Sequence, residues 1–333
     1  NNRVQCSTWL DNPWACRMSS MACTPVGCLN GKQKALAACR KACRRPLLFA
    51  SVLAGLALAL SPQRARAASP WSPQPGHGYF KIWSKWLAGF GYHDGQGNTR
   101  SYGPYHELFV AGYGEVGVAP GLAAWAHSDL GRFFLLGNPR TGRNRAHAAP
   151  GDPALGLRYQ FLHQAGIAAA VELGARAPLA NRQPVQTVYA TSEGQPAVGA
   201  LRVGFGAWEI PFALSAGWSW RGGYAAASAG YRVRTNAYDD ALTWSAETGS
   251  ELGDRGRGRL RLTGVHNIRN GTAPRHQSPS GLGNGTSYVG VALEAEYAFS
   301  PGWYLGGTFE GGLAGIRRQT GGPVLSFYVA TQF

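Results

Sequence analysis

The sequence has no cysteine after residue 43, no methionine after residue 21 and no long apolar run after residue 60. Cys23 and Cys28 lack cysteine or histidine partners at the spacing of a zinc site, so we expect neither a metal centre nor a cofactor. Acidic residues are also scarce, with 17 Asp and Glu against 32 Lys and Arg. Ten of the basic residues and one acidic residue precede Ala68, which leaves a net charge of +6 from there on. That modest charge gives no reason to predict nucleic-acid binding.

The single apolar run, Leu47–Leu60, follows four basic residues between positions 40 and 45. It is too short for a membrane-spanning helix, and small residues follow it at Ala65 and Ala67. We therefore predict a secretory signal peptide over residues 40–67, cleaved between Ala67 and Ala68. Residues 1–39 are interpreted as an upstream extension without structure of its own.

Glycine and aromatic residues are abundant, with 47 Gly, 14 Tyr and 11 Trp. Pro323–Phe333 alternates strictly, with Leu325 and Phe327 on one face and Ser326 and Tyr328 on the other. About ten alternating residues are the length of a transmembrane β-strand. The segment resembles the closing strand of bacterial outer-membrane β-barrels, in which a terminal aromatic residue such as Phe333 is the signal read by the barrel-assembly machinery.

Similar alternation recurs along the chain after a short tail, residues 68–77, that we place in the periplasm. Thirteen segments alternate, or fourteen with Val185–Thr191, and a single-chain barrel with both termini in the periplasm needs an even number. We therefore predict an all-β fold, a closed antiparallel transmembrane barrel over residues 78–333 with about fourteen strands and twelve as the alternative. The other thirteen segments are Gly78–Leu87, Glu107–Val118, Leu122–Leu135, Ala154–Leu162, Ile167–Ala177, Val198–Trp208, Phe212–Trp220, Ala225–Arg234, Ala241–Gly249, Gly258–Ile268, Ser287–Phe299, Trp303–Leu313 and Pro323–Phe333.

A soluble β-sandwich would show the same local alternation. Two further features favour a membrane barrel: aromatic residues gather near strand ends, and long and short turns alternate along most of the chain. In hydrocarbon every backbone polar group needs an internal partner, which a closed sheet provides without an edge. We therefore expect the cell outer membrane of a Gram-negative bacterium as the location and its lipid as a partner.

Charged side chains on the other face of these strands should then line a polar lumen. They could pair across strands to support the wall, or form a selectivity lining that screens solutes. Arginines two residues apart on nearby strands, Arg232 with Arg234 and Arg259 with Arg261, favour a basic stripe if glutamates do not neutralise it. The predicted lumen-lining residues are Lys81, Lys85, Glu107, Glu115, Asp129, Arg158, Glu172, Arg176, Arg202, Arg232, Arg234, Glu247, Arg259, Arg261, Glu294, Glu296 and Glu310.

Catalysis is the less favoured interpretation. His127 and Asp129 share a face, as an Asp–His site requires, but the sequence contains no Gly-x-Ser-x-Gly element, and we predict no catalytic residue. Asp94 begins a Gly-rich turn that could contact a cation, although it lacks the full spacing of a calcium loop. We interpret it as a plain turn.

Three short motifs resemble a diffuse family of putative outer-membrane transporters associated with aromatic (phenol) degradation pathways. They are Gly76-His-Gly-Tyr-Phe80, Gly151-Asp-Pro-Ala-Leu-Gly-Leu-Arg-Tyr159 and Gly230-Tyr-Arg-Val-Arg234. The resemblance implies uptake of small solutes. The predicted function is therefore a passive outer-membrane channel, with a structural or surface-interaction barrel as the alternative and a barrel hydrolase as the least favoured.

Overall fold

The structure is a computed structural model that describes residues 70–137, 144–180, 185–190, 196–275 and 280–333. The predicted upstream extension and signal peptide lie outside these residues. The described residues all belong to one compact unit. Among the described residues, no helix is long and apolar enough to cross a membrane. The strands are β1 Gly78–His93, β2 Thr99–Ala119, β3 Leu122–Gly137, β4 Asn144–Ala149, β5 Ala154–Gln164, β6 Ile167–Arg176, β7 Val185–Ala190, β8 Pro196–Leu201, β9 Glu209–Trp220, β10 Gly223–Arg234, β11 Ala241–Leu252, β12 Gly256–Asn267, β13 Ser287–Ser300, β14 Trp303–Arg317 and β15 Val324–Gln332.

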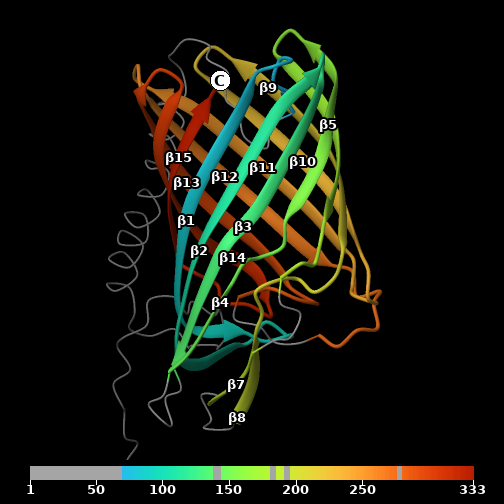
Figure 1. Cartoon of the computed structure of the whole chain (residues 1–333), viewed down its shortest axis with the longest axis vertical. Coiled ribbons are helices and arrows are strands. Elements are labelled where there is room, and N and C mark those ends of the chain that lie inside the picture. Colours follow the sequence, from blue (N-terminus) through green and yellow to red (C-terminus); the bar gives the residue numbers. More distant parts are fainter. Residues whose placement is uncertain (1–69, 138–143, 181–184, 191–195, 276–279) are drawn as a thin grey trace, which may run out of the picture. The chain divides into compact units, whose positions relative to one another are not determined.

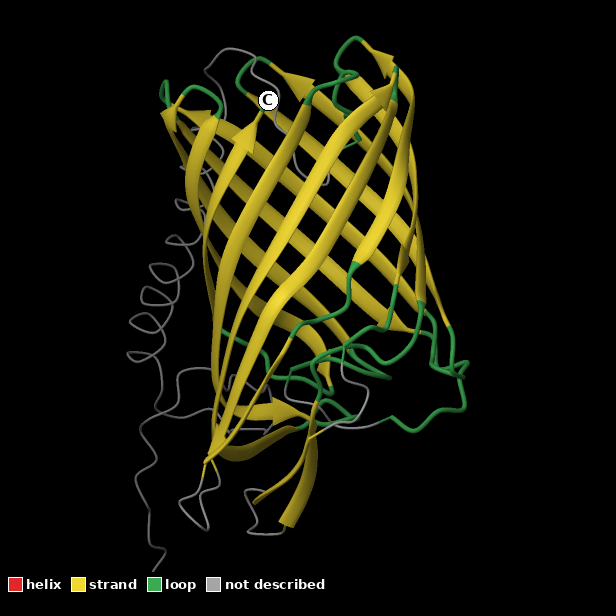
Figure 2. Ribbon diagram, viewed as in Figure 1, coloured by secondary structure: helices red, strands yellow, loops and turns green. Residues whose placement is uncertain are grey.

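Twelve antiparallel strands form a closed barrel. Figures 1 and 2 show its wall of tilted strands. Most neighbours in sequence pair with each other, and β1 closes the circle by pairing with β15 from Tyr79↔Gln332 to Leu87↔Val324. The Gly78 amide also donates to the Phe333 carbonyl at 2.9 Å. β4 is an additional strand that pairs with the second half of β3, outside the circle of twelve. The all-β closed barrel predicted from the alternation is confirmed.

The number of strands differs from the preferred prediction of fourteen and equals the alternative. β7 pairs only with β8, in a separate two-stranded sheet, and most of the predicted strand Val198–Trp208 is loop. The reason is that β6 pairs directly with β9, from Ile167↔Trp218 to Arg176↔Glu209, which leaves no place for a strand between them. The Asp152 carboxylate holds both ends of the connection between β6 and β9, accepting from the Ala180 amide at 2.9 Å and the Phe205 amide at 2.6 Å.

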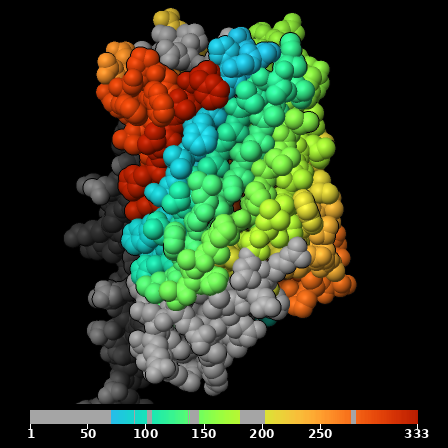
Figure 3. All heavy atoms as spheres, in the orientation of Figure 1, coloured from blue at the N-terminus to red at the C-terminus, as the bar shows by residue number. Residues whose placement is uncertain are grey.

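Alternation along each strand gives the barrel two chemically different faces. On β15, Leu325 and Phe327 are 39% and 65% exposed, whereas Ser326 and Tyr328 are 4% and 3% exposed. Exposed large apolar side chains recur in this way on β1, β5, β9, β13 and β14. One outer face, covered by adjoining bands of side chains from β1, β2 and β3, is visible in Figure 3. A wall that is apolar outside and polar inside is the pattern of a membrane-spanning barrel.

The two ends of the barrel differ in the length of their connections. Turns of two or three residues join β2 to β3, β5 to β6, β9 to β10, β11 to β12 and β13 to β14. This short-turn end also holds Gly78 and Phe333 and lies at the top of Figure 1. At Gly121 the turn has a φ of 74°, a conformation that glycine adopts without the cost paid by other residues. The opposite, long-loop end carries the connections between β6 and β9 and between β12 and β13.

Candidate functional site: the barrel interior

Ion pairs join most of the charged side chains that the sequence predicts on the interior face. Fifteen of the seventeen predicted residues form at least one pair in the structure. Arg202 lies instead in the connection before β9, where its Nη1 donates to the Tyr238 hydroxyl at 3.5 Å. Arg232 makes no ion pair among the described residues. The fifteen are Lys81, Lys85, Glu107, Glu115, Asp129, Arg158, Glu172, Arg176, Arg234, Glu247, Arg259, Arg261, Glu294, Glu296 and Glu310.

Glu294 on β13 is the centre of the largest cluster. Its carboxylate lies 3.3 Å from Lys81 Nζ and 3.4 Å from a guanidinium nitrogen of both Arg259 and Arg261. The Tyr328 hydroxyl donates to the same carboxylate at 2.5 Å. The Glu294 side chain is only 3% exposed, so these cations offset the cost of burying its charge.

A second cluster joins β2, β5 and β6 around Arg158. Its guanidinium donates to Glu115 at 2.9 Å and to Glu172 at 2.9 and 3.0 Å. The Tyr113 hydroxyl donates to Glu115 at 2.8 Å. Each buried carboxylate and guanidinium therefore has several partners, as buried charges in proteins require.

The predicted basic stripe is wrong, because the strand registers separate its two halves. Arg261 pairs in register with Glu247, which pairs with Ala226 on β10. Arg232 lies six residues further along that strand, roughly 20 Å away at the rise of an extended chain. Three of the four arginines also lie beside carboxylates: Arg259 and Arg261 both pair with Glu294, and Arg234 pairs with Glu209 at 2.7 Å.

Sequence analysis missed Arg132, because a β-bulge changes the alternation of β3. The register shifts between Val110↔Gly131 and Ala111↔Asp129, so Leu130 is the extra residue and points outward, 54% exposed. Both Asp129 and Arg132 consequently face inward and pair at 2.6 Å. A strict period of two had placed them on opposite faces.

A cavity of about 340 Å³ occupies the barrel interior, with a lining drawn from most of its strands. Part of the lining is aromatic, namely Tyr79, Trp83, Tyr113, Trp125 and Tyr328. Part is charged, with the Glu294 and Arg158 clusters on opposite sides. A third part, on β9 and β10, consists of the small side chains Ala213, Ser215 and Ser228. Alternation placed Tyr328 on the same face as Ser326, but sequence analysis did not predict an aromatic lining, because it assigned aromatic residues near strand ends to the membrane interfaces.

Residues 70–77 cross the inner side of the short-turn end, where sequence analysis had predicted only a periplasmic tail. Pro70 and Pro73 are fully buried, and the Trp71 ring meets the Tyr224 ring edge-on at 5.9 Å. The Ser72 amide donates to Gln160 Oε1 at 3.0 Å. Pro75 forms a parallel bridge with Gly117 of β2. The segment therefore narrows this end of the interior.

Loops from several strands meet over the long-loop end. The buried side chains of Tyr92, Tyr105, Phe134, Val203 and Leu282 form one hydrophobic cluster there. Residues 70–77 and this cluster therefore lie at opposite ends of the barrel, with the charged cavity between them.

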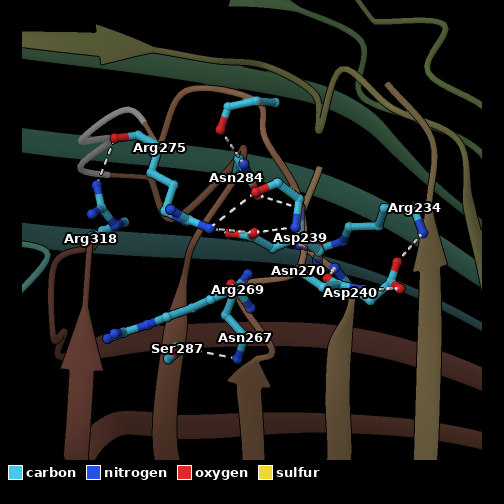
Figure 4. Close-up of polar contacts among 12 residues, drawn as sticks. Arg234, Asp239, Asp240, Asn267, Arg269, Asn270, Arg275, Asn284, Ser287 and Arg318 are labelled. Carbon is cyan, nitrogen blue, oxygen red and sulfur yellow. Dashed lines mark hydrogen bonds and ion pairs between the residues drawn. The ribbon is translucent and has the colours of Figure 1, made fainter. Parts of the chain in front are cut away.

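The loops at the long-loop end also hold a polar network, which Figure 4 shows. The Asp239 carboxylate, fully buried, accepts from Arg275 Nε at 2.5 Å and Nη2 at 2.6 Å, while the Asp239 amide donates to Asn284. Arg318 Nη1 donates to the Arg275 carbonyl at 2.6 Å. Burial and the nearby Arg275 and Arg269 guanidinium groups lower the pKa of Arg318.

Asp94 holds the turn between β1 and β2, which supports its interpretation as a plain turn. Its Oδ1 accepts from the Gln96 and Asn98 amides, both at 2.9 Å, and its Oδ2 accepts from Arg100 Nε at 3.0 Å. Burial alone would raise the pKa of this carboxyl, but these donors together hold it below its ordinary value. The lone pairs that a cation would use are engaged by the protein itself.

Comparison with solved structures places the fold among outer-membrane β-barrels. An outer-membrane channel from Pseudomonas putida F1 aligns with a TM-score of 0.53 and 10% sequence identity, over 81% of this chain and 100% of that one. The NanC porin aligns with a TM-score of 0.44 and 9% identity, over 76% and 98% of the two chains. The toluene transporter TodX of Pseudomonas putida aligns with a TM-score of 0.40 and 10% identity, over 78% and 89%. No protein-family model and no curated protein matches the sequence.

Proposed function

We propose that the chain is a passive outer-membrane channel that carries small solutes through an interior lined by Arg and Glu, without catalysis. The observation that carries this proposal is the inversion of polarity across the wall. Exposed apolar side chains cover the outside, whereas paired charges surround a cavity of about 340 Å³ inside. Lipid contacts the outer face, and water and solute enter the inner one.

The proposal includes an orientation in the membrane. The short-turn end, with Gly78 and Phe333 side by side, faces the periplasm, and the long-loop end faces the outside. Short periplasmic turns and longer external loops are the asymmetry of bacterial outer-membrane barrels. The assembly machinery would then meet the exposed terminal Phe333 from the periplasm, after export directed by residues 40–67.

The charged residues of the interior line the channel and do not form a reactive centre. His127 lies 3.7 Å from Asp129, but Asp129 is also 2.6 Å from Arg132 Nη2. The carboxylate is thus shared with a permanent cation. Charged pairs on opposite sides of the cavity give permeating solutes alternating donors and acceptors, which is how channel linings select.

The experiment compares two cysteine variants on adjacent positions of β10. Ser228 lines the cavity, and Ala229 is exposed on the outer face. The protein, purified from outer membranes in detergent, is placed in planar bilayers, and a charged thiol reagent is added to Ser228→Cys and Ala229→Cys. We expect conductance steps in both, and a fall in current only for Ser228→Cys.

Silent bilayers, obtained with protein that shows the heat-dependent gel shift of a folded barrel, would refute the channel. They would favour the alternative, a structural or surface-interaction barrel. The coverage of both barrel ends, by residues 70–77 and by the cluster around Tyr92, is the observation on which that alternative rests. An equal loss of current in both cysteine variants would refute the assignment of the lining.

A further inference from the structure

Trp125 forms an aromatic platform on the inner wall of the cavity. A Cβ atom added to Gly156 would lie 2.5 Å from Trp125 Cζ2, and one added to Gly174 would lie 2.7 Å from the same atom. The indole therefore lies directly over two glycines of β5 and β6, and any larger residue would push it into the cavity. This arrangement holds a flat apolar surface against the wall and leaves room beside it for a second ring.

Four residues that line this cavity have a buried polar atom without a hydrogen-bond partner among the described residues. The atoms are Trp125 Nε1, Arg261 Nε, the Tyr79 hydroxyl and the Ser326 hydroxyl. Tyr79 and Ser326 are 2% and 4% exposed. Indole and guanidinium nitrogens can only donate, and hydroxyls can donate as well. Among the described residues of the lining, no carboxylate oxygen is buried without a partner. An occupant with acceptor atoms would therefore complement these donors.

The charge around Glu294 calls for one further anion. Lys81, Arg259 and Arg261 share this carboxylate. Among the residues that the structure describes, the only other acid within 4.0 Å of the three cations is Glu247, 3.8 Å from Arg261 Nε. Three cations face two carboxylates, so the cluster has an excess of one positive charge. A ligand carboxylate has one negative charge, which offsets the excess positive charge of the cluster. Its two oxygens also have lone pairs that can accept from the donors without partners.

We propose that this cavity is a binding site for small aromatic monocarboxylates on the permeation path. The carboxylate accepts from Arg261 Nε and meets the Lys81 ammonium, while the ring lies toward Trp83 and Trp125. β3 and β12 are on opposite sides of the barrel, so the ligand lies across the cavity with its charged end at β12. This inference rests on the proposed channel function and specifies its substrate class.

The test measures binding of benzoate to the purified full-length protein in detergent by calorimetry. Phenol and glucuronate serve as comparison ligands, the first with a ring and no charge, the second with a charge and no aromatic ring. We expect benzoate to bind at least tenfold more tightly than either. Equal affinity for glucuronate would overturn the aromatic requirement, and equal affinity for phenol would overturn the carboxylate requirement.

Variants assign the binding to the named groups. Arg261→Lys keeps the charge but removes the Nε donor, and we expect affinity to fall roughly ten- to a hundredfold, as for a lost hydrogen bond to a charged group. Trp125→Phe keeps a ring over the glycines and removes the N–H group, so we expect a smaller loss, and Trp125→Leu should lose more. Trp244→Leu is the matched control, because that indole lies over Gly264 and is 40% exposed on the outer face.

Each variant is first checked for the heat-dependent gel shift. Unchanged benzoate affinity in both folded Arg261→Lys and Trp125→Leu would overturn the site. Bilayer recordings separate this inference from the channel itself. Steady conductance without benzoate binding or block would refute the substrate class and leave the channel standing. Benzoate binding to a protein that never conducts would refute the channel.

Discussion

Replacing Glu294 with glutamine should both destabilise the barrel and move its selectivity toward anions. The change removes one carboxylate from a cluster in which it faces Lys81, Arg259 and Arg261. The excess positive charge of that cluster, counted with Glu247, then rises from one to two. The Tyr328 hydroxyl would still have Glu296 at 3.1 Å as an acceptor. The substitution therefore mainly leaves the three cations without their shared negative charge.

The structure sets the size of the effect on stability. Removing one partner of a buried ion pair costs about 3–5 kcal/mol, because the opposite charge stays buried without compensation. The Glu294 side chain is 3% exposed, so this range applies to it. Glu310→Gln is the matched control: its single pair with Lys85 is 30% and 23% exposed, and such pairs contribute about 0–1 kcal/mol.

Two measurements check this prediction. Urea titration in detergent, followed by the gel shift, should show a large loss of stability for Glu294→Gln and little change for Glu310→Gln. Under a potassium chloride gradient, the reversal potential of Glu294→Gln should move toward that of chloride relative to the unmodified protein. If that variant conducts with an unchanged reversal potential, the Glu294 cluster does not face the permeating ions.

Three other changes test the ends of the barrel. Deleting Phe333, which is 61% exposed and accepts from the Gly78 amide, should lower the amount of barrel in the outer membrane without altering the conductance of the channels that form; normal insertion would count against its role in assembly. Gly117→Val should dislodge residues 70–77 and raise conductance, because an added Cβ would lie 2.5 Å from the Pro73 carbonyl oxygen. Gly311→Ala is the control, because a Cβ added there would have no atom within 4 Å. Equal currents in the two variants would contradict the conclusion that residues 70–77 narrow the interior. Asp94 has a pKa below its ordinary value, so its contribution to the turn is complete above about pH 4 and is lost as pH falls through the lowered pKa. The protection of the Gln96 and Asn98 amides, measured as exchange relative to the intrinsic rate at each pH, should therefore be the same at pH 7 and pH 5. It should be lower in Asp94→Asn at both pH values, and protection unaffected by the substitution would exclude this role.

The barrel could be predicted from the sequence because its physical cause is local. Alternation such as Leu325, Ser326, Phe327, Tyr328 is imposed by lipid on one side and a polar interior on the other, and each strand carries it independently. The inward position of the charged residues could be predicted for the same reason, whereas their pairing was one of two alternatives. Glu294 and Arg261 stand at alternate positions of their own strands, even though their contact depends on register.

Features that depend on pairing between distant segments could not be predicted. Arg132 faces inward because of the bulge at Leu130, and alternation cannot reveal an extra residue. The preferred prediction of fourteen strands was wrong because of the region between β6 and β9. Its alternating segments β7 and β8 pair with each other and do not join the barrel wall. The contact of Pro70 and Trp71 with Gly217 likewise joins segments that no sequence period relates.

Closure between β1 and β15 has a consequence for the route by which the chain folds. Tyr79 and Gln332 are partners across the seam, so the last strand of the barrel must find the first. Until then both seam strands are unpaired edges, and such edges recruit other chains. Contacts of such long sequence separation also form slowly. On the proposed route to the outer membrane, the polypeptide must therefore be kept from other chains until β15 is available to pair with β1. The rate at which the seam closes then sets how long that protection has to last.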